Sequence, residues 1–273
     1  MQPLIPYFDP PKLTLTGDIA IHAFGVLVAV GFVVGQRVSE TKAGRYGGDP
    51  ALVNRLVTWL VLGTFLGGHW GHLLFYDPQS VVEDPMVIFR FWQGLSSYGG
   101  FLACVPITIW FFHRARTSYW PYADALAHGM GIGWFFGRLG CFSAHDHPGG
   151  PTNFWLGVPG MCRDAPGDAS VACHDLGLYE SIWSLTVFLL FMALDTKPRF
   201  PGFYVGMLAF LYGPFRFVLD FFRVTDVDVR YVGLTPAQYF SILVSGLGIW
   251  ILQRQRALPP SWRGESAQAG AVA

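Results

Sequence analysis

Long apolar segments alternate with short polar ones along almost the whole chain. We predict that seven of them form membrane-spanning helices, because a spanning helix needs about 20 mostly apolar residues. The seven segments cover residues 18–35, 51–76, 95–112, 122–144, 178–194, 201–222 and 235–252. The predicted fold class is therefore an all-α integral membrane protein. Its one seven-helix domain covers residues 1–258 with an outer loop at 145–177, and a disordered polar tail covers 259–273.

The composition supports a membrane protein. Hydrophobic residues make up 52% of the chain and charged residues only 13%, whereas soluble domains carry about 25% charged residues. The formal net charge is zero, so no overall field indicates a nucleic-acid partner. The N-terminus lacks the basic segment of a cleaved signal peptide, and we expect the first span to act as an uncleaved signal.

Basic residues predict the orientation of the spans, because cytoplasmic loops are enriched in lysine and arginine. With seven spans, one side collects Arg37, Lys42, Arg45, Arg55, Arg114, Arg116, Lys197, Arg199, Arg254, Arg256 and Arg263. The other side collects Lys12, Arg90, Arg163, Arg223 and Arg230. We therefore expect the N-terminus outside, the C-terminus in the cytoplasm, and the loop at 145–177 on the outer face.

Two of the four cysteines, Cys162 and Cys173, fall in this outer loop. Disulfides form in such oxidising compartments, but the spacing leaves open whether these two residues pair. Cys104 lies inside the third span and is interpreted as a small packing residue.

The end of the fourth span carries the densest candidate chemistry. Arg138 has no acidic neighbour in sequence, and an arginine near hydrocarbon costs about 2.5–3.5 kcal/mol unless a partner, water or an anionic ligand relieves it. Cys141, His145, Asp146 and His147 follow. Their Cys-x3-His-x-His spacing is compatible with zinc or with a histidine-activated cysteine nucleophile. The simpler interpretation is a polar loop that contacts lipid head groups.

Charged residues also occur inside the sixth span. Arg216 and Asp220 are four residues apart, so they share a helix face and can pair. They form either a structural ion pair or part of a substrate site, and arginine holds phosphate bidentately. Glu180, at the start of the fifth span, either lines the same cavity or caps its helix.

Two residue pairs that contain histidine lie inside spans and are interpreted mainly as structural. His69 and His72 share a face of the second span, which permits a metal pair, but no third ligand follows from the spacing. Asp124 and His128 are a second pair at helical spacing. We expect no metal site and no cofactor.

Seven collinear segments resemble motifs of the prolipoprotein diacylglyceryl transferase family. Gly137-Arg138-Leu139-Gly140-x-Phe142, with an acid at 146 and Gly149, resembles the family's Gly-Arg-x-Gly-Asn-Phe-x-Asn-x-Glu-x-x-Gly. A second strong match is Tyr212-Gly213-x-x-Arg216-x-x-x-Asp220-Phe221-Phe222-Arg223. Further matches lie at residues 21–25, 66–76, 97–100, 174–180 and 234–238.

The resemblance implies an enzyme of the bacterial cytoplasmic (inner) membrane. That family transfers a diacylglyceryl group from phosphatidylglycerol to the cysteine thiol of a lipoprotein precursor and releases glycerol phosphate. The implied partners are phosphatidylglycerol, the signal-peptide region of the prolipoprotein, and membrane lipids. The implied catalytic residues are Arg138, Arg216, Asp220, Tyr98 and Asp146. The implied substrate-binding residues are Arg138, Arg216, His22, Phe24, Gly99, Gly100, Cys141, Gly149 and Glu180.

The chain departs from the family pattern at several polar positions. Phe24 replaces a tyrosine, Tyr98 a histidine, Cys141 an asparagine, Asp146 a glutamate and His69 an arginine. A second asparagine of the signature is also changed, to alanine. The alternative hypothesis is therefore a non-catalytic or re-purposed phospholipid-binding paralogue. If the enzyme is active, its general base has either stayed at these positions or moved to one of the two loop histidines.

Overall fold

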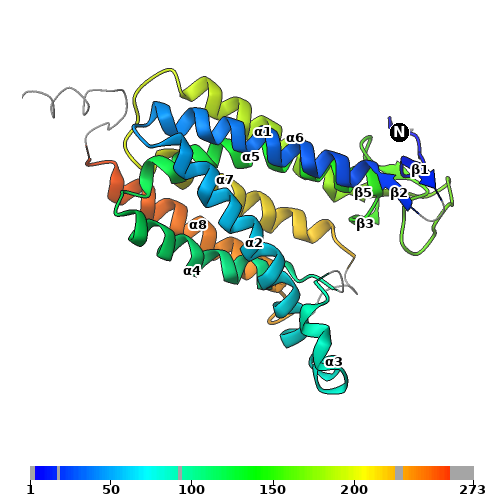
Figure 1. The fold of residues 1–273 in the computed structure, drawn as a ribbon. Helices are drawn as coiled ribbons and strands as arrows, with labels where there is room; N and C mark the ends of the chain where they lie inside the picture. The colour runs from blue at the N-terminus through cyan, green and yellow to red at the C-terminus, as the bar shows by residue number, and fades with distance from the viewer. Residues whose placement is uncertain (1–3, 17–18, 92–93, 225–229, 259–273) are drawn as a thin grey trace, which may run out of the picture.

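The computed structural model describes residues 4–16, 19–91, 94–224 and 230–258 and is mostly helical (Figure 1). Among these residues, seven long helices correspond to the seven predicted segments. They are α1 (Ala23–Arg45), α2 (Pro50–Phe75), α4 (Ser97–Ala115), α5 (Trp120–Ala144), α6 (Leu176–Leu194), α7 (Phe203–Leu219) and α8 (Pro236–Gln255). Four helices are long and apolar enough to cross a membrane, namely α1, α2, α6 and α7 with its extension η2 (Asp220–Phe222). The structure is thus that of a multi-pass helical membrane protein.

The helix starts follow from local capping chemistry. Asp49 and Asp175 accept hydrogen bonds from backbone N–H groups in the first turns of α2 and α6. Thr235 and Gln238 form a reciprocal capping box at the start of α8. These side chains satisfy N–H groups that otherwise lack a partner at a helix start.

The predicted start of the first span was wrong. The first span begins only at residue 23, because Ile19–His22 form strand β2, which pairs antiparallel with β1 (Lys12–Thr16). Pairing in a hairpin satisfies this backbone without a helix, and α1 instead continues through its basic end to residue 45. Two short helices, α3 (Pro78–Glu83) and η1 (Pro85–Phe89), lie between α2 and α4.

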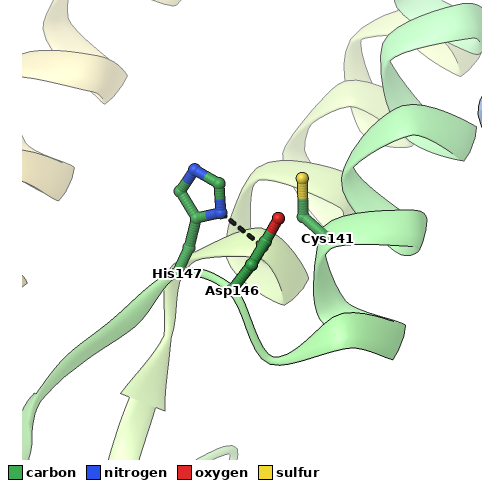
Figure 2. Close-up of side chains that lie close together, drawn as sticks. All are labelled: Cys141, Asp146 and His147. Carbon is green, nitrogen blue, oxygen red and sulfur yellow. Dashed lines mark hydrogen bonds and ion pairs between the residues drawn. The ribbon is translucent and has the colours of Figure 1, made fainter. Parts of the chain in front are cut away.

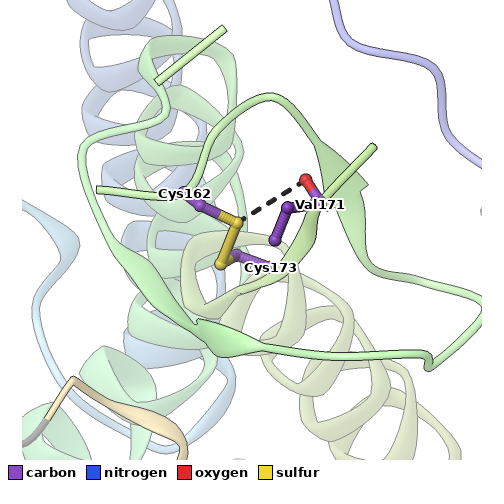
Figure 3. The surroundings of a disulfide bond; sticks show 3 residues. All are labelled: Cys162, Val171 and Cys173. Carbon is purple, nitrogen blue, oxygen red and sulfur yellow. Dashed lines mark hydrogen bonds between the residues drawn. A yellow bond between two sulfur atoms is a disulfide. The ribbon is translucent and has the colours of Figure 1, made fainter. Parts of the chain in front are cut away.

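The predicted polar loop after α5 is an ordered cap, which we define as residues 145–175. It contains a three-stranded antiparallel sheet in the order β3–β5–β4, with β3 at Pro148–Pro151, β4 at Val158–Pro159 and β5 at Ala172–Asp175. Cys162 and Cys173 form a disulfide with Cα atoms 5.3 Å apart (Figure 3), which answers the question that their spacing left open. The all-α prediction missed both small sheets, which lie together at one end of the helices (Figure 1).

Helix α5 lies at the centre of the bundle and packs against α1, α6 and α7. Small residues allow α1 and α5 to approach closely. A Cβ added at Gly129 would lie 1.9 Å from Ser39 Oγ and 2.4 Å from the Gly35 carbonyl oxygen. Contacts between small residues of this kind are typical of helix association in membranes.

A buried ionic cluster joins α1, α6 and α7 at the end opposite the cap. Asp195, whose side chain is 1% exposed, lies 2.5 Å from Lys42 Nζ and 2.9 Å from Arg45 Nη1. Tyr46 and Tyr204 donate hydroxyl hydrogen bonds to its other oxygen. A buried carboxylate is tolerable because it is paired and hydrogen-bonded.

Candidate functional site

Two arginines from different helices converge on one buried carboxylate. Arg138 of α5 forms an ion pair with Glu180 Oε2 on the first turns of α6. Arg216 of α7 places Nε 3.7 Å from the other oxygen, Oε1. The Glu180 side chain is 4% exposed, whereas the guanidinium side chains are about one-fifth exposed, at 21% and 17%. The structure therefore places Glu180 in the cavity between the arginines, which was one of its two predicted roles.

The second acid of the site is Asp220, which is fully buried. Arg216 donates a 2.8 Å hydrogen bond from Nη1 to Asp220 Oδ1, and Thr235 donates its hydroxyl to the other oxygen. Arg223 Nη1 lies 3.8 Å from Oδ1. The predicted pairing of residues 216 and 220 is confirmed. Arg223 was not predicted as a site residue, although it closes the matched Phe-Phe-Arg motif.

The two arginines stay partly exposed although their carboxylate partners are buried. The side chains of Arg138 and Arg216 are 21% and 17% exposed, whereas those of Glu180 and Asp220 are 4% and 0% exposed. Arginine binds phosphate through two parallel N–H groups. The arrangement therefore suits a lipid or other ligand that carries a phosphate.

A second cluster lies beside the first. Cys141, Asp146 and His147 place their ligand atoms within 4.8 Å of one another (Figure 2). Helix α5 ends at His145, whose left-handed backbone (φ 51°) turns the chain so that the next two residues face the thiol. His147 Nε2 lies 3.4 Å from Arg138 Nη1, so the two clusters are in contact.

Electrostatics inside this second cluster favour a charged imidazole. The Asp146 carboxylate contacts His147 Nδ1, and this contact, followed by the Cys141 side chain, raises the pKa of His147 to about 9. His147 is partly exposed and Cys141 is buried. Of the two loop histidines considered as a base, His147 is therefore the one that faces the site.

His145 points away and has a structural role. Its Nε2 lies 3.0 Å from the Phe8 carbonyl oxygen, and its Nδ1 lies 3.5 Å from Asp175 Oδ2. Its ring also stacks on Tyr7 at a centroid distance of 5.3 Å. The hydrogen bond to Asp175 raises the pKa of His145, and burial raises the pKa of Asp175. The predicted Cys-x3-His-x-His set thus does not converge, and Asp146 takes the place of this histidine.

A pocket of about 710 Å³ opens next to the second cluster. Its walls come from β2, the first turns of α1 and the end of α5, and they include His22, Phe24 and Asp146. Most other lining residues are apolar. Three residues predicted to bind substrate or catalyse thus line one cavity.

The predicted glycines have visible packing roles. A Cβ at Gly149 would lie 2.5 Å from the Phe222 carbonyl oxygen, and Gly149 forms a bridge with Arg223 that docks the cap on η2. Gly99 and Gly100 lie in the α2–α4 contact, where a Cβ at Gly99 would be 2.2 Å from a backbone oxygen of α2. Their direct contact with substrate stays a prediction.

The remaining candidates are Tyr98, His69 and Asp124. The side chain of Tyr98 lies outside the described part of the chain. His69 is buried, with Nε2 2.9 Å from the Val87 carbonyl oxygen, and Asp124 accepts hydrogen bonds from the backbone N–H groups at the start of α7. Both observations support the structural interpretation of those residues.

Comparison with known proteins agrees with the motif resemblance. A family model described as prolipoprotein diacylglyceryl transferase matches residues 10–254. Similar curated proteins carry the name phosphatidylglycerol–prolipoprotein diacylglyceryl transferase. The protein from Solidesulfovibrio magneticus is 33% identical over 258 residues, which cover 92% of this chain and 96% of the relative. Relatives from Nitratidesulfovibrio vulgaris and Pseudomonas putida F1 are 31% and 30% identical over 92% and 94% of this chain, and 95% and 98% of their own lengths.

Proposed function

Because the chain belongs to the prolipoprotein diacylglyceryl transferase family, we propose that it transfers a diacylglyceryl group from phosphatidylglycerol to the cysteine thiol of a prolipoprotein. Glycerol phosphate is the second product. The observation that carries the proposal is the convergence of Arg138 and Arg216 on Glu180, with both arginine side chains still partly exposed. No feature of the described residues favours the non-catalytic alternative.

The arginines act on the leaving group. The thiol sulfur attacks the glycerol carbon that bears the phosphate ester, and the carbon–oxygen bond breaks with its electron pair on the phosphate oxygen. Negative charge therefore grows on the phosphate, and fixed donors aimed at it stabilise the transition state. Arg138 and Arg216 supply these donors, while Glu180 and Asp220 hold the two guanidinium groups in position.

The acceptor side of the reaction is assigned to the pocket. Its apolar wall, which includes Phe24, suits the apolar part of a signal peptide or an acyl chain, and His22 also lines it. The acceptor thiol must lose its proton, and Asp146 is the charged group that lines this pocket. We assign to Tyr98 the role of the family's histidine, because Tyr98 stands at that residue's position.

The membrane placement is part of the proposal. We place seven spans in the bacterial inner membrane, with the N-terminus and cap outside and the C-terminus in the cytoplasm. The disulfide in the cap supports an oxidising outer side. Reporter fusions after Arg116 and Arg199 should report the cytoplasm, and a fusion inside the cap should report the exterior. The reverse pattern would contradict this topology.

The direct test is a transfer assay with the full chain in detergent. A lipobox peptide is incubated with phosphatidylglycerol, and a mass increase equal to one diacylglyceryl group on its cysteine is expected. A peptide with serine in place of the cysteine, and phosphatidylethanolamine in place of the donor, are controls. Arg138→Ala should lose the transfer, whereas Arg90→Ala, which removes a partly exposed arginine that follows η1 and pairs with Asp84, should keep it. If the parent protein produces no mass shift of the peptide under any condition, the proposed function is refuted.

A further inference from the structure

The Cys141–Asp146–His147 cluster contains a thiol, a carboxylate and an imidazole at one point. We propose that these three side chains bind one zinc ion, at which the acceptor cysteine is activated as a metal-bound thiolate. The activation part of this proposal rests on the proposed function. The binding part stands on the cluster alone.

The donor set and its spacing fit zinc. Zinc binds cysteine sulfur at about 2.3 Å and histidine nitrogen or carboxylate oxygen at about 2.0–2.2 Å. In a tetrahedral site the ligand atoms are therefore about 3.2–3.8 Å apart. Asp146 and His147 are already in contact, and all three ligand atoms lie within 4.8 Å. Side-chain movements on the order of 1 Å complete the geometry: the thiol moves closer, and the Asp146 and His147 ligand atoms move apart to admit the ion.

Three ligands leave one coordination position open. His145 cannot supply a fourth, because its two ring nitrogens face Phe8 and Asp175. Catalytic zinc sites keep three protein ligands and an open position for water or substrate, whereas structural sites are closed by four. Asp146 also lines the pocket, and we therefore place the open position toward the cavity that we assign to the acceptor.

The proposed step is balanced without any redox change. The acceptor thiol takes the open position as a thiolate and releases its proton to solvent, since a coordinating thiol is deprotonated outright. Cys141 and Asp146 already cancel the two charges of the ion, so the acceptor sulfur keeps its electron density. That sulfur forms the new carbon–sulfur bond, and the phosphate takes the electrons of the broken carbon–oxygen bond. The product is a neutral thioether, a weak ligand that leaves the metal.

The binding test uses the purified full chain in detergent, stripped with a chelator and kept free of thiol reductants so that the cap disulfide stays closed. Titration with Co²⁺ should give one equivalent of binding and a thiolate-to-cobalt charge-transfer band, and Zn²⁺ should displace the cobalt. Cys141→Ser should lose the band and weaken binding by more than about 100-fold, since even partners outside the ligand shell are worth about 10–100-fold. Cys104→Ser, the matched loss of the other free thiol, should change neither. A parent protein without the band, or a Cys141→Ser variant that keeps it, would overturn the site.

The activation test compares stripped and zinc-loaded protein in the transfer assay. We expect stripping, verified by metal analysis, to abolish transfer and zinc to restore it. Full-rate transfer by metal-free protein would overturn the activation step and leave the proposed function intact. No transfer by the zinc-loaded protein, together with an intact cobalt band, would refute the proposed function and the activation step, and the metal site would stand.

Discussion

Replacing Glu180 by glutamine removes the charge that holds the two arginines together while keeping the size of the side chain. In the parent protein this carboxylate touches Arg138 and lies 3.7 Å from Arg216 Nε. The Glu180→Gln variant leaves two positive groups facing each other across a neutral amide. We therefore expect a less stable protein that depends on an added anion.

The magnitude follows from the geometry. Two unit charges 3.7 Å apart interact by about 4.5 kcal/mol at an effective dielectric constant of about 20. Removing one member of a buried pair costs about 3–5 kcal/mol in practice, and the retained amide oxygen places this variant near the lower limit. A bound phosphate supplies the missing negative charge. At about 100 times its dissociation constant, a lipid stabilises the folded state by about 2.7 kcal/mol, which recovers most of the loss.

The assay is thermal unfolding in detergent, followed by tryptophan fluorescence, with and without phosphatidylglycerol. Without lipid, Glu180→Gln should unfold at a lower temperature than the parent. Phosphatidylglycerol should raise the unfolding temperature of the variant more than that of the parent, and zwitterionic phosphatidylethanolamine should not. Glu83→Gln, which removes an exposed acid from α3, is the matched control and should match the parent throughout.

The result that would refute this reasoning is specific. If phosphatidylglycerol stabilises the parent and Glu180→Gln equally, the anionic head group does not enter the charge cluster. If Glu180→Gln is as stable as the parent without lipid, Glu180 does not hold the arginines. Either outcome removes the arrangement of charges from which the phosphate site was argued.

Three further predictions follow from other contacts. Arg138→Ala and Arg216→Ala should each lower the transfer rate on the order of 10²–10³-fold, and Arg138→Lys should restore only part of it, because lysine lacks the bidentate fork; an equal rate for lysine and arginine would contradict this. Asp195→Ala should lower the free energy of unfolding by about 3–5 kcal/mol, measured by denaturation, while the stabilisation by phosphatidylglycerol stays unchanged; a lost lipid response would argue against two separate clusters. Gly149→Ala should loosen the cap and speed its cleavage in limited proteolysis, since the added Cβ would lie 2.5 Å from the Phe222 carbonyl oxygen of η2. Gly150→Ala, whose Cβ would lie 3.8 Å from the same oxygen, should be cleaved like the parent. Equal cleavage of the two variants would show that Gly149 does not hold the cap on η2.

The helices were predictable from sequence because an apolar run of the right length has few alternatives in lipid. The sequence also indicated the pairing of Arg216 with Asp220, since helical spacing alone brings positions four apart together. The role of Glu180 was left open, because its partners come from two other helices. No local pattern predicts which helices become neighbours.

The structure of the cap and of the N-terminal hairpin was not predicted from the sequence. Ile19–His22 and the three short cap strands were missed, because two to four residues carry too little periodicity to distinguish a strand from a loop. The left-handed turn at His145 decides which side chains meet Cys141. A non-glycine residue in that conformation is uncommon, so the spacing alone contained no reason to prefer Asp146 over His145 as the third member of the cluster.

The position of the pocket determines how substrate concentration has to be expressed. Its walls include the first turns of α1, a helix long and apolar enough to cross a membrane. A lipid or a signal peptide that reaches this cavity by lateral diffusion is confined to two dimensions. The relevant variable is then the mole fraction of phosphatidylglycerol among the surrounding lipids, not its amount per volume of solution. Diluting the donor with inert lipid at constant total volume should lower the transfer rate, whereas diluting whole donor-containing proteoliposomes in buffer should leave the rate per enzyme unchanged.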